Sequence, residues 1–185
     1  IKFASENYAG RTATLFMKFN LTDFGAGCVM NGVYGAVYDT LYVSENGIYP
    51  VFWGEKNGAA SGCFFSFGEL ETYVLKLNSA TLETVNAVNL SGYTVYDRQA
   101  LKQFGDKLYV VCSRTNGAGT SVVAFNASDL SLCSELKNIA PDEDVKSVSY
   151  KKEADGKLSC LITTYRNIDP LFKVDITDPE NMSLM

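Results

Sequence analysis

The chain has 185 residues, of which 46% are hydrophobic and 12% aromatic, enough apolar material to fill one sizeable core. Its 16 basic and 21 acidic side chains leave a net charge of −5, and an acidic surface that repels phosphate argues against nucleic acid as a partner. The sequence holds no apolar run near the roughly 18 residues of a membrane span, and it lacks histidine, which excludes Ser-His and Cys-His nucleophiles within this chain.

Four segments of the chain end in nearly the same way, each with an alternating apolar strand, then Asn or Asp, then a short polar turn. The segments cover residues 14–27, 72–85, 120–133 and 170–183. The matching positions are Asn20, Asn78, Asn126 and Asp175, which lie 58, 48 and 49 residues apart. A period near fifty residues that is built from strands is typical of the blades of a β-propeller.

Upstream of these endings, three more segments resemble one another and predict the second strand of each repeat. They begin at an acidic turn, and they are aligned here on Leu41, Leu108 and Leu158. The interval from Leu41 to Leu108 exceeds the next one, so the first complete repeat is expected to carry an insertion of roughly a dozen or more residues. Residues 35–40, 96–104 and 145–152 precede these strands and predict the innermost strand, which gives four strands per repeat.

The expected fold is therefore all-β, with about 3.75 blades of four antiparallel strands in a single domain over residues 1–185. The predicted blades are a partial blade 1 at 1–32, blade 2 at 33–92, blade 3 at 93–141 and blade 4 at 142–185. Because the start of the chain aligns with a second strand, blade 1 lacks its innermost strand. We favour part of a larger propeller over a closed four-bladed ring, and unpaired strand edges predict possible self-association.

The most specific motif lies near the end of the chain, from Ile168 to Asn181. The runs Ile168-Asp169-Pro170-Leu171-Phe172 and Asp178-Pro179-Glu180-Asn181, with Asp175 between them, resemble the pattern VDPLFVIDLSDPENP of the secreted bacterial and archaeal β-propeller domain family, which is distantly related to WD-repeat propellers. Residues 96–113 and 120–148 are also similar, so the resemblance covers about residues 70–185, although Met182 replaces the final proline. It implies a longer natural domain at an extracellular or cell-surface location, and it assigns no catalytic residues. The motif itself predicts turns, since Pro and Asp favour them.

Possible cofactor sites are weak in this sequence. The acidic runs Asp142-Glu143-Asp144 and Asp175, Asp178, Glu180 lack the spacing of a calcium loop, and they are interpreted as solvated surface and turns. The five cysteines contain no pair at the spacing that zinc or redox motifs require, and an odd count favours thiols over a disulfide framework. We therefore expect no metal and no cofactor.

The best candidate for recognition is the aromatic segment from Tyr49 to Phe67, interpreted as the inserted hairpin. Tyr49, Phe52 and Trp53 are the predicted ligand-binding residues, because Tyr and Trp provide large, rigid contact area. The alternative is that these rings pack between blades, and it is favoured for Phe64, Phe65 and Phe67, whose alternation continues a strand. The expected function is a non-catalytic module that binds or scaffolds a protein or carbohydrate ligand. The alternatives are an extracellular propeller hydrolase or lyase with carboxylates at the channel mouth, and a domain that only spaces or caps others.

Overall fold

The computed structural model describes residues 2–3, 13–34, 37–55, 70–115, 119–165 and 170–185. The chain forms two compact units, Ile1–Ser91 and Gly92–Met185. In these ranges the regular structure consists of strands and two single-turn 3₁₀ helices, which confirms the predicted all-β class. None of the helices described is long and apolar enough to cross a membrane.

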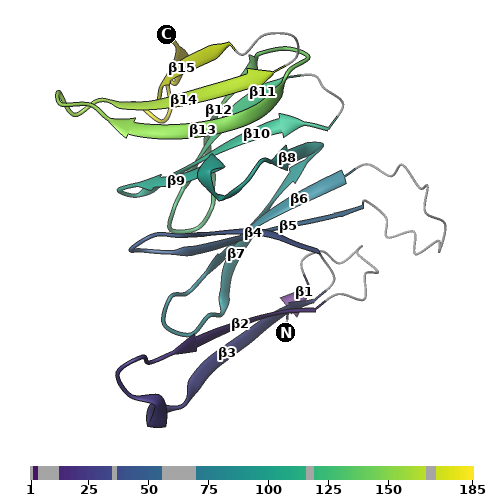
Figure 1. Ribbon diagram of the computed structural model, residues 1–185, viewed down its shortest axis with the longest axis vertical. Helices are drawn as coiled ribbons and strands as arrows, with labels where there is room; N and C mark the ends of the chain where they lie inside the picture. Colours follow the sequence, from purple (N-terminus) through teal and green to yellow (C-terminus); the bar gives the residue numbers. More distant parts are fainter. Residues whose placement is uncertain (1, 4–12, 35–36, 56–69, 116–118, 166–169) are drawn as a thin grey trace. The chain divides into compact units, whose positions relative to one another are not determined.

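The first unit contains two sheets, which Figure 1 shows in purple to teal. The first has the order β1-β3-β2, and the second is an antiparallel meander in the order β4-β5-β6-β7. The elements are β1 (Lys2–Phe3), β2 (Ala13–Phe19), η1 (Phe24–Ala26), β3 (Cys28–Tyr34), β4 (Val37–Val43), β5 (Ile48–Glu55), β6 (Leu70–Leu77) and β7 (Thr84–Ser91).

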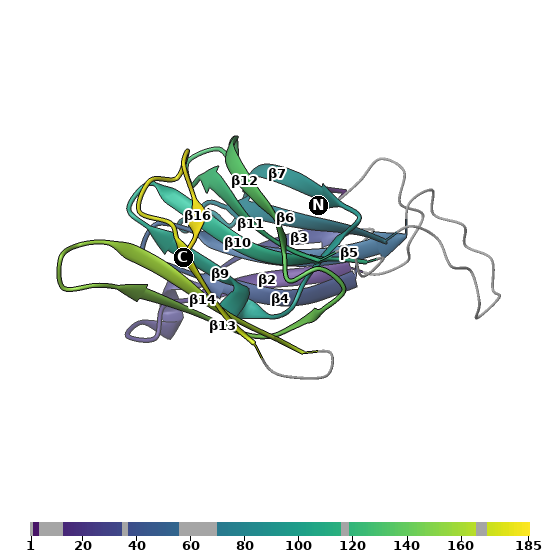
Figure 2. The ribbon, with the colours of Figure 1, turned by 90° about the horizontal axis from the view of Figure 1, so that it is seen from above.

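The second unit also contains two antiparallel sheets. In one, β12, β11 and β10 lie side by side and β10 pairs with both β8 and β9, and in the other the order is β13-β14-β15-β16. Figure 2 shows β13 and β14 as a long hairpin. The elements are β8 (Tyr93–Val95), η2 (Arg98–Ala100), β9 (Leu101–Phe104), β10 (Lys107–Arg114), β11 (Thr120–Asn126), β12 (Leu132–Ile139), β13 (Asp144–Lys152), β14 (Leu158–Tyr165), β15 (Leu171–Asp175) and β16 (Ser183–Leu184).

The first sheet differs from the predicted partial blade. A second strand at the start of the chain would lie beside β2, but β1 pairs in parallel with β3, where Lys2 is opposite Val33. This pairing occupies the outer edge of β3, which would otherwise present unpaired backbone groups. It leaves β2 with β3 as its sole partner strand in the described ranges, and β3 itself continues to Tyr34, two residues past the predicted end of blade 1.

The alignment of Leu41 with Leu108 and Leu158 is wrong. Leu108 and Leu158 lie in β10 and β14, the second strands of their sheets, whereas Leu41 lies in β4, a first strand. Both strands of the β4–β5 hairpin carry apolar alternation after a turn, so the pattern fits either one. The true counterpart is β5, which places residues 49–55 in a core strand. The insertion therefore falls in residues 56–69, and Phe64, Phe65 and Phe67 lie outside the described residues.

The core of the first unit lies between its two sheets. Phe16 and Val33 of the first sheet pack against Phe52, Tyr73 and Leu75 of the second, and the Phe16 and Phe52 rings meet edge to face at 6.3 Å. Polar contacts reinforce the same contact region, since the Asn31 side chain donates to the Leu82 carbonyl at 2.9 Å and Lys18 Nζ donates to the Ser79 carbonyl at 3.0 Å. The two sheets of this unit are thus joined by an apolar centre with donors at its border.

In the second unit, tyrosine hydroxyls join the two sheets. Tyr109 Oη donates to the Ile176 carbonyl at 2.9 Å, and Tyr150 Oη donates to the Ala100 carbonyl at 2.8 Å. The Phe104 ring meets both tyrosines edge to face, with centroids 6.3 Å away in each case. These buried aromatic residues satisfy their polar atoms while they fill the space between sheets.

The repeated Asn and Asp residues hold turns, as the sequence predicts. A side-chain oxygen of Asn20, Asn78 and Asp175 accepts the backbone N–H two residues later, at 3.0, 2.8 and 2.9 Å. Asn126 differs, because its oxygen accepts from Lys107 Nζ at 2.6 Å. Asp178 likewise accepts the Glu180 N–H at 3.0 Å. The Asp178–Asn181 motif therefore has the turn role expected from Asx chemistry.

Candidate functional site

A hollow of about 240 Å³ lies in the second unit, where the first strands of its two sheets start. Its lining combines two hydroxyls, an aromatic ring, a carboxylate and an ammonium group. The lining residues are Thr94, Tyr96, Ser113, Asp144, Val145 and Lys146. Thr94 and Ser113 are directly opposite each other on β8 and β10, and residues 144–146 begin β13.

One wall of the hollow exists because a first strand is interrupted. The strand stops at Val95 and resumes at Leu101, and the Asp97 carboxylate caps the intervening η2 by accepting the Gln99 N–H at 2.6 Å. Asp at such a cap stabilises a helical turn over a continued strand. Tyr96 therefore lies outside the β ladder and is 52% exposed at the hollow.

The opposite wall is shaped by a bulge in β13. The register between β13 and β14 shifts between Val145 and Ser147, so Lys146 has no residue directly opposite it. A bulge bends the strand and re-aims the side chains beside it. Both first strands of this unit thus depart from regular pairing at the hollow.

The segment that leads into this wall has an unusual backbone. Asn138, Ala140 and Asp142 all have left-handed φ values, at 60°, 48° and 61°. Such conformations are uncommon outside glycine, and they persist where the surrounding structure imposes them, often beside functional sites. Gly119 approaches this segment closely, because a Cβ added there would lie 3.2 Å from the Ile139 carbonyl oxygen.

A buried hydroxyl group lies next to the hollow. Thr120 is directly opposite Ser113 in the β10–β11 ladder, so both side chains lie on the same face of the sheet. Thr120 Oγ1 is fully buried and has no hydrogen-bond partner among the described residues. A buried hydroxyl without a partner costs about 1–3 kcal/mol, so a bound polar group beside Ser113 would remove this cost.

The end of β8 is fixed from the opposite face of the sheet by a polar network. Tyr93 Oη donates to Glu135 Oε1 at 2.7 Å and accepts from Arg114 Nε at 3.2 Å, while Lys137 pairs with Glu135 at 3.1 Å. Burial by itself would raise the pKa of Glu135, but hydrogen bonds from Tyr93, Lys137 and Ser121 outweigh it and lower that pKa below its ordinary value. The network thus holds a charged carboxylate and, with it, the strand that carries Thr94.

The comparison with known protein families agrees with this series of consecutive, mostly antiparallel sheets. The sequence model of the family described as beta propeller domain matches residues 3–185. The chain belongs to the β-propeller domain family. No curated protein and no solved structure matches it. Blades 1 to 4 of this propeller are accordingly β1–β3, β4–β7, β8–β12 and β13–β16, and the hollow lies at the first strands of blades 3 and 4, the strands that line the channel in a propeller.

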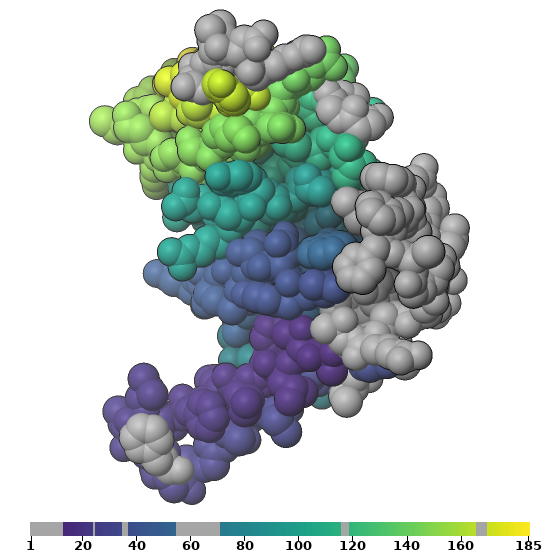
Figure 3. Space-filling view, turned by 45° about the vertical axis from the view of Figure 1, so that its right-hand side comes forward, coloured from purple at the N-terminus to yellow at the C-terminus, as the bar shows by residue number. Residues whose placement is uncertain are grey.

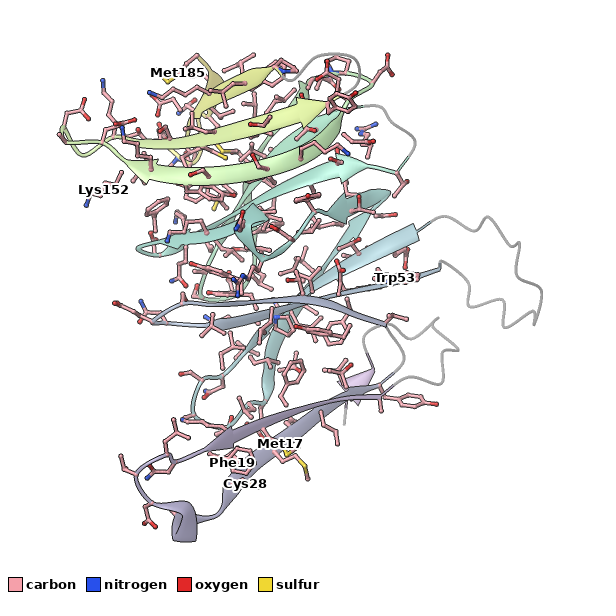
Figure 4. The ribbon with its side chains drawn as sticks, in the orientation of Figure 1. Met17, Phe19, Cys28, Trp53, Lys152 and Met185 are labelled. Atoms are coloured by element: carbon pink, nitrogen blue, oxygen red, sulfur yellow. The ribbon has the colours of Figure 1, made fainter. Side chains whose placement is uncertain are left out.

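The predicted aromatic residues are not gathered on one surface of the propeller. Tyr49 and Phe52 are fully buried, and Trp53 is 39% exposed. Figure 4 shows Trp53 near the end of β5. Tyr49 stacks on Tyr42 at 6.0 Å, and burial, with a smaller contribution from Tyr42, raises the pKa of Tyr49 to about 12. Successive side chains of a strand face opposite ways, so Phe52 and Trp53 lie on different faces of blade 2. A ligand role for these residues stays a prediction.

Neither acidic cluster forms a metal site in the described part of the propeller, where no three potential ligands come together. A hydrogen bond from Thr177 lowers the pKa of Asp175, and one from Asn181 lowers that of Asp178, so both carboxylates act in turns. Of the other run, Glu143 accepts from Thr164 Oγ1, and Asp144 lines the hollow.

Sequence reasoning missed most residues of the hollow. The one usable signal was the Asp97-Arg98-Gln99 stretch, a cap and polar turn that interrupts an otherwise strand-like region. No sequence pattern indicated Lys146, because the bulge beside it depends on how β13 pairs with its partner strand β14.

Proposed function

We propose that this propeller is a non-catalytic recognition module and that its ligand binds in the hollow at the first strands of blades 3 and 4. The observation that carries the proposal is the lining, in which Tyr96 offers an exposed ring beside the hydroxyls of Thr94 and Ser113. The Thr120 hydroxyl next to Ser113 has no hydrogen-bond partner among the residues that the structure describes, and this supports a polar ligand.

The size of the hollow favours a group no larger than one sugar ring. Its volume, about 240 Å³, is below the range of about 300–1,000 Å³ that sites for whole small molecules occupy. An aromatic ring with hydroxyls and two charged groups suits a polyhydroxylated ligand better than an apolar side chain. Between the protein and carbohydrate ligands expected from the sequence, this chemistry favours carbohydrate. Lys146 would further favour an acidic sugar over a neutral one.

The same lining favours binding over hydrolysis. Glycoside hydrolases generally use two carboxyl groups, about 5–9.5 Å apart, that flank the bond to be broken. Among the lining residues that the structure describes, Asp144 is the one carboxylate, and Lys146 is two positions away. A hydrolase or lyase would need a second carboxylate from outside this set, so enzymatic activity stays the alternative.

We also propose that the module works outside the cell or at its surface. The support is the resemblance of residues 168–181 to a secreted propeller family. Fractionation of the native cells with an antibody against this chain tests it, and recovery in the cytosolic fraction would contradict it.

Two variants test the binding site against the aromatic segment predicted from the sequence. Binding to a panel of soluble neutral and uronic-acid polysaccharides would be measured for the unaltered chain, Tyr96→Ala and Trp53→Ala, with thermal unfolding as a check on folding. Loss of an anchoring aromatic residue costs about 2 kcal/mol, roughly thirtyfold in Kd, so we expect that loss in Tyr96→Ala. Loss confined to Trp53→Ala would assign recognition to blade 2, and binding of no polysaccharide would contradict the proposal.

A further inference from the structure

The turn between β4 and β5 contains an asparagine directly before a glycine. The turn consists of residues 44–47, in which Asn46 is exposed and Gly47 is buried. Figure 3 shows the blue segment that contains this turn at the surface. An Asn-Gly pair is chemically labile, because glycine has no side chain to hinder the attack of its backbone nitrogen on the asparagine side chain. Whether such a pair reacts depends on how the fold holds the two reacting groups.

The hydrogen bonds of this turn leave both reacting groups unused. The Ser44 hydroxyl accepts the Asn46 N–H at 3.3 Å and donates to the Gly47 carbonyl at 3.2 Å, and the Ser44 N–H donates to the same carbonyl at 2.9 Å. Among the residues that the structure describes, no hydrogen bond involves the Asn46 amide group or the Gly47 N–H. Three contacts of Ser44 therefore close the turn, and none of them fixes the asparagine side chain.

Packing in the core of the blade requires the glycine. A Cβ added at Gly47 would lie 2.6 Å from the Tyr49 ring, which is fully buried and stacks on Tyr42. The ring fills the space in which a side chain at position 47 would otherwise shield the backbone nitrogen. The reactive partner of Asn46 is thus a consequence of how Tyr49 packs.

The same pair of residues is held in a different way in β3. Asn31 is half-buried, its Nδ2 donates to the Leu82 carbonyl at 2.9 Å, and its Oδ1 accepts the Gly32 N–H at 2.8 Å. Gly32 is also opposite Leu15 in the β2–β3 ladder. Asn31 must break these bonds and β3 must open before the attack occurs, whereas a short turn opens at a lower free-energy cost.

We propose that Asn46 is a site of spontaneous deamidation. The backbone nitrogen of Gly47 bonds to Cγ of Asn46, the Cγ–Nδ2 bond breaks, and the amide group leaves as ammonia with the proton of the Gly47 N–H. Water then adds to either carbonyl of the resulting cyclic imide and opens the ring, which gives aspartate or isoaspartate. Water is the sole co-reactant.

The two products differ in their effect on the blade. Aspartate changes an exposed side chain that has no hydrogen-bond partner among the described residues, so the unfolding midpoint should stay the same. Isoaspartate adds one backbone carbon to a turn that Ser44 closes and that lies against the Tyr49 ring. The longer backbone presses on a buried ring, so isoaspartate should lower the unfolding midpoint.

Peptide mapping of the 185-residue chain tests the proposal. The chain would be incubated at mildly alkaline pH with and without urea, digested, and analysed by tandem mass spectrometry. This separates Asn46 and Asn31 from the Asn-Gly pairs at 57–58 and 116–117, which lie outside the described residues. Each folded-state rate is divided by the rate of the same site in urea. We expect this ratio to be at least about tenfold higher for Asn46 than for Asn31, and equal ratios or a lower ratio at Asn46 would overturn the proposal.

Two variants separate the chemistry from the fold. Ser44→Ala removes the hydroxyl contacts that close the turn, so it should accelerate deamidation at Asn46 and leave the rate at Asn31 unchanged. No acceleration at Asn46 would contradict control by the turn. Asn46→Ser removes the reactive amide, and its unfolding midpoint should stay constant through the incubation while that of the unaltered chain falls. An equal fall in both would show that deamidation at Asn46 does not destabilise the blade.

Discussion

Tyr109 and Ile176, in blades 3 and 4, are joined by a hydrogen bond of 2.9 Å from the tyrosine hydroxyl to the isoleucine carbonyl. Both residues are buried, so neither group can exchange this partner for water. The contact is a long-range link between two sheets, each of which has its own internal ladder.

Tyr109→Phe removes this link without changing the ring. It leaves the buried Ile176 carbonyl without its donor, so we expect a loss of about 1–3 kcal/mol in the free energy of unfolding. Urea denaturation followed by fluorescence measures it. Tyr165→Phe, at an exposed tyrosine of the same unit, is the control and should stay within about 0.5 kcal/mol. Equal effects of the two variants would show that the hydrogen bond does not stabilise the unit.

Two buried tyrosines should make the chain sensitive to alkali. Burial is the main cause that raises the pKa of both Tyr49 and Tyr109 to about 12, from an ordinary value of 10.0. A raised pKa favours the neutral form in the folded state, so the associated stability is complete below pH 10 and is lost as pH rises toward 12. Unfolding free energies across this interval should fall less steeply for the Tyr49→Phe, Tyr109→Phe double variant. An unchanged slope would contradict this assignment.

The opposite pH dependence is expected for Glu135. Its pKa is lowered in the folded state, so the stability it provides is present above its ordinary value of 4.5 and is lost as pH falls through the folded value. Glu135→Gln should therefore flatten the acid side of the stability profile. Tyr93→Phe, which deletes a donor to this carboxylate, should flatten it in part, and a double-mutant cycle should reveal coupling between the two residues. Additive effects would mean that the two groups do not interact.

The strained segment before β13 predicts a difference between two glycines. Gly119 and Gly156 both have positive φ, at 103° and 87°, but an added Cβ at Gly119 would press on the Ile139 carbonyl whereas the space at Gly156 is open. Both alanine variants should lose about 1 kcal/mol of unfolding free energy because of the positive φ. Gly119→Ala should lose more, because its Cβ also presses on the carbonyl. Thermal unfolding measures the difference. Equal losses would show that the segment around Ile139 shifts to accommodate the added Cβ without a loss of stability.

Sequence reasoning succeeded where the cause of structure is local. The Asn20, Asn78 and Asp175 turns depend on a side chain that bonds to its own backbone, so their spacing revealed the blades. Alternation showed which residues share a face, but not what covers that face. Met17 and Leu75 hold the same repeat position with the same chemistry, and only the neighbouring sheet makes one exposed and the other buried.

The hollow could not be predicted for a related reason. Thr94 and Lys146 are 52 positions apart, and they meet because two blades pack together. The bulge at Lys146 depends on the partner strand and leaves no clear pattern in one chain, whereas the Asp97-Arg98-Gln99 stretch is a local signal for the break after Val95. Tyr49 and Phe52 were interpreted as part of an inserted hairpin because β4, the first strand of its sheet, was aligned with the second strands of the later repeats.

The most direct test of the proposed function is an amide ¹H–¹⁵N spectrum of the chain, titrated separately with a neutral glucan oligosaccharide and with an oligogalacturonate. The account predicts shifts that cluster on residues 94–96, 113 and 144–146 and that saturate at lower concentration for the oligogalacturonate, because Lys146 faces its carboxylate. Shifts centred on Trp53, or no shifts with either probe, would contradict recognition at the hollow.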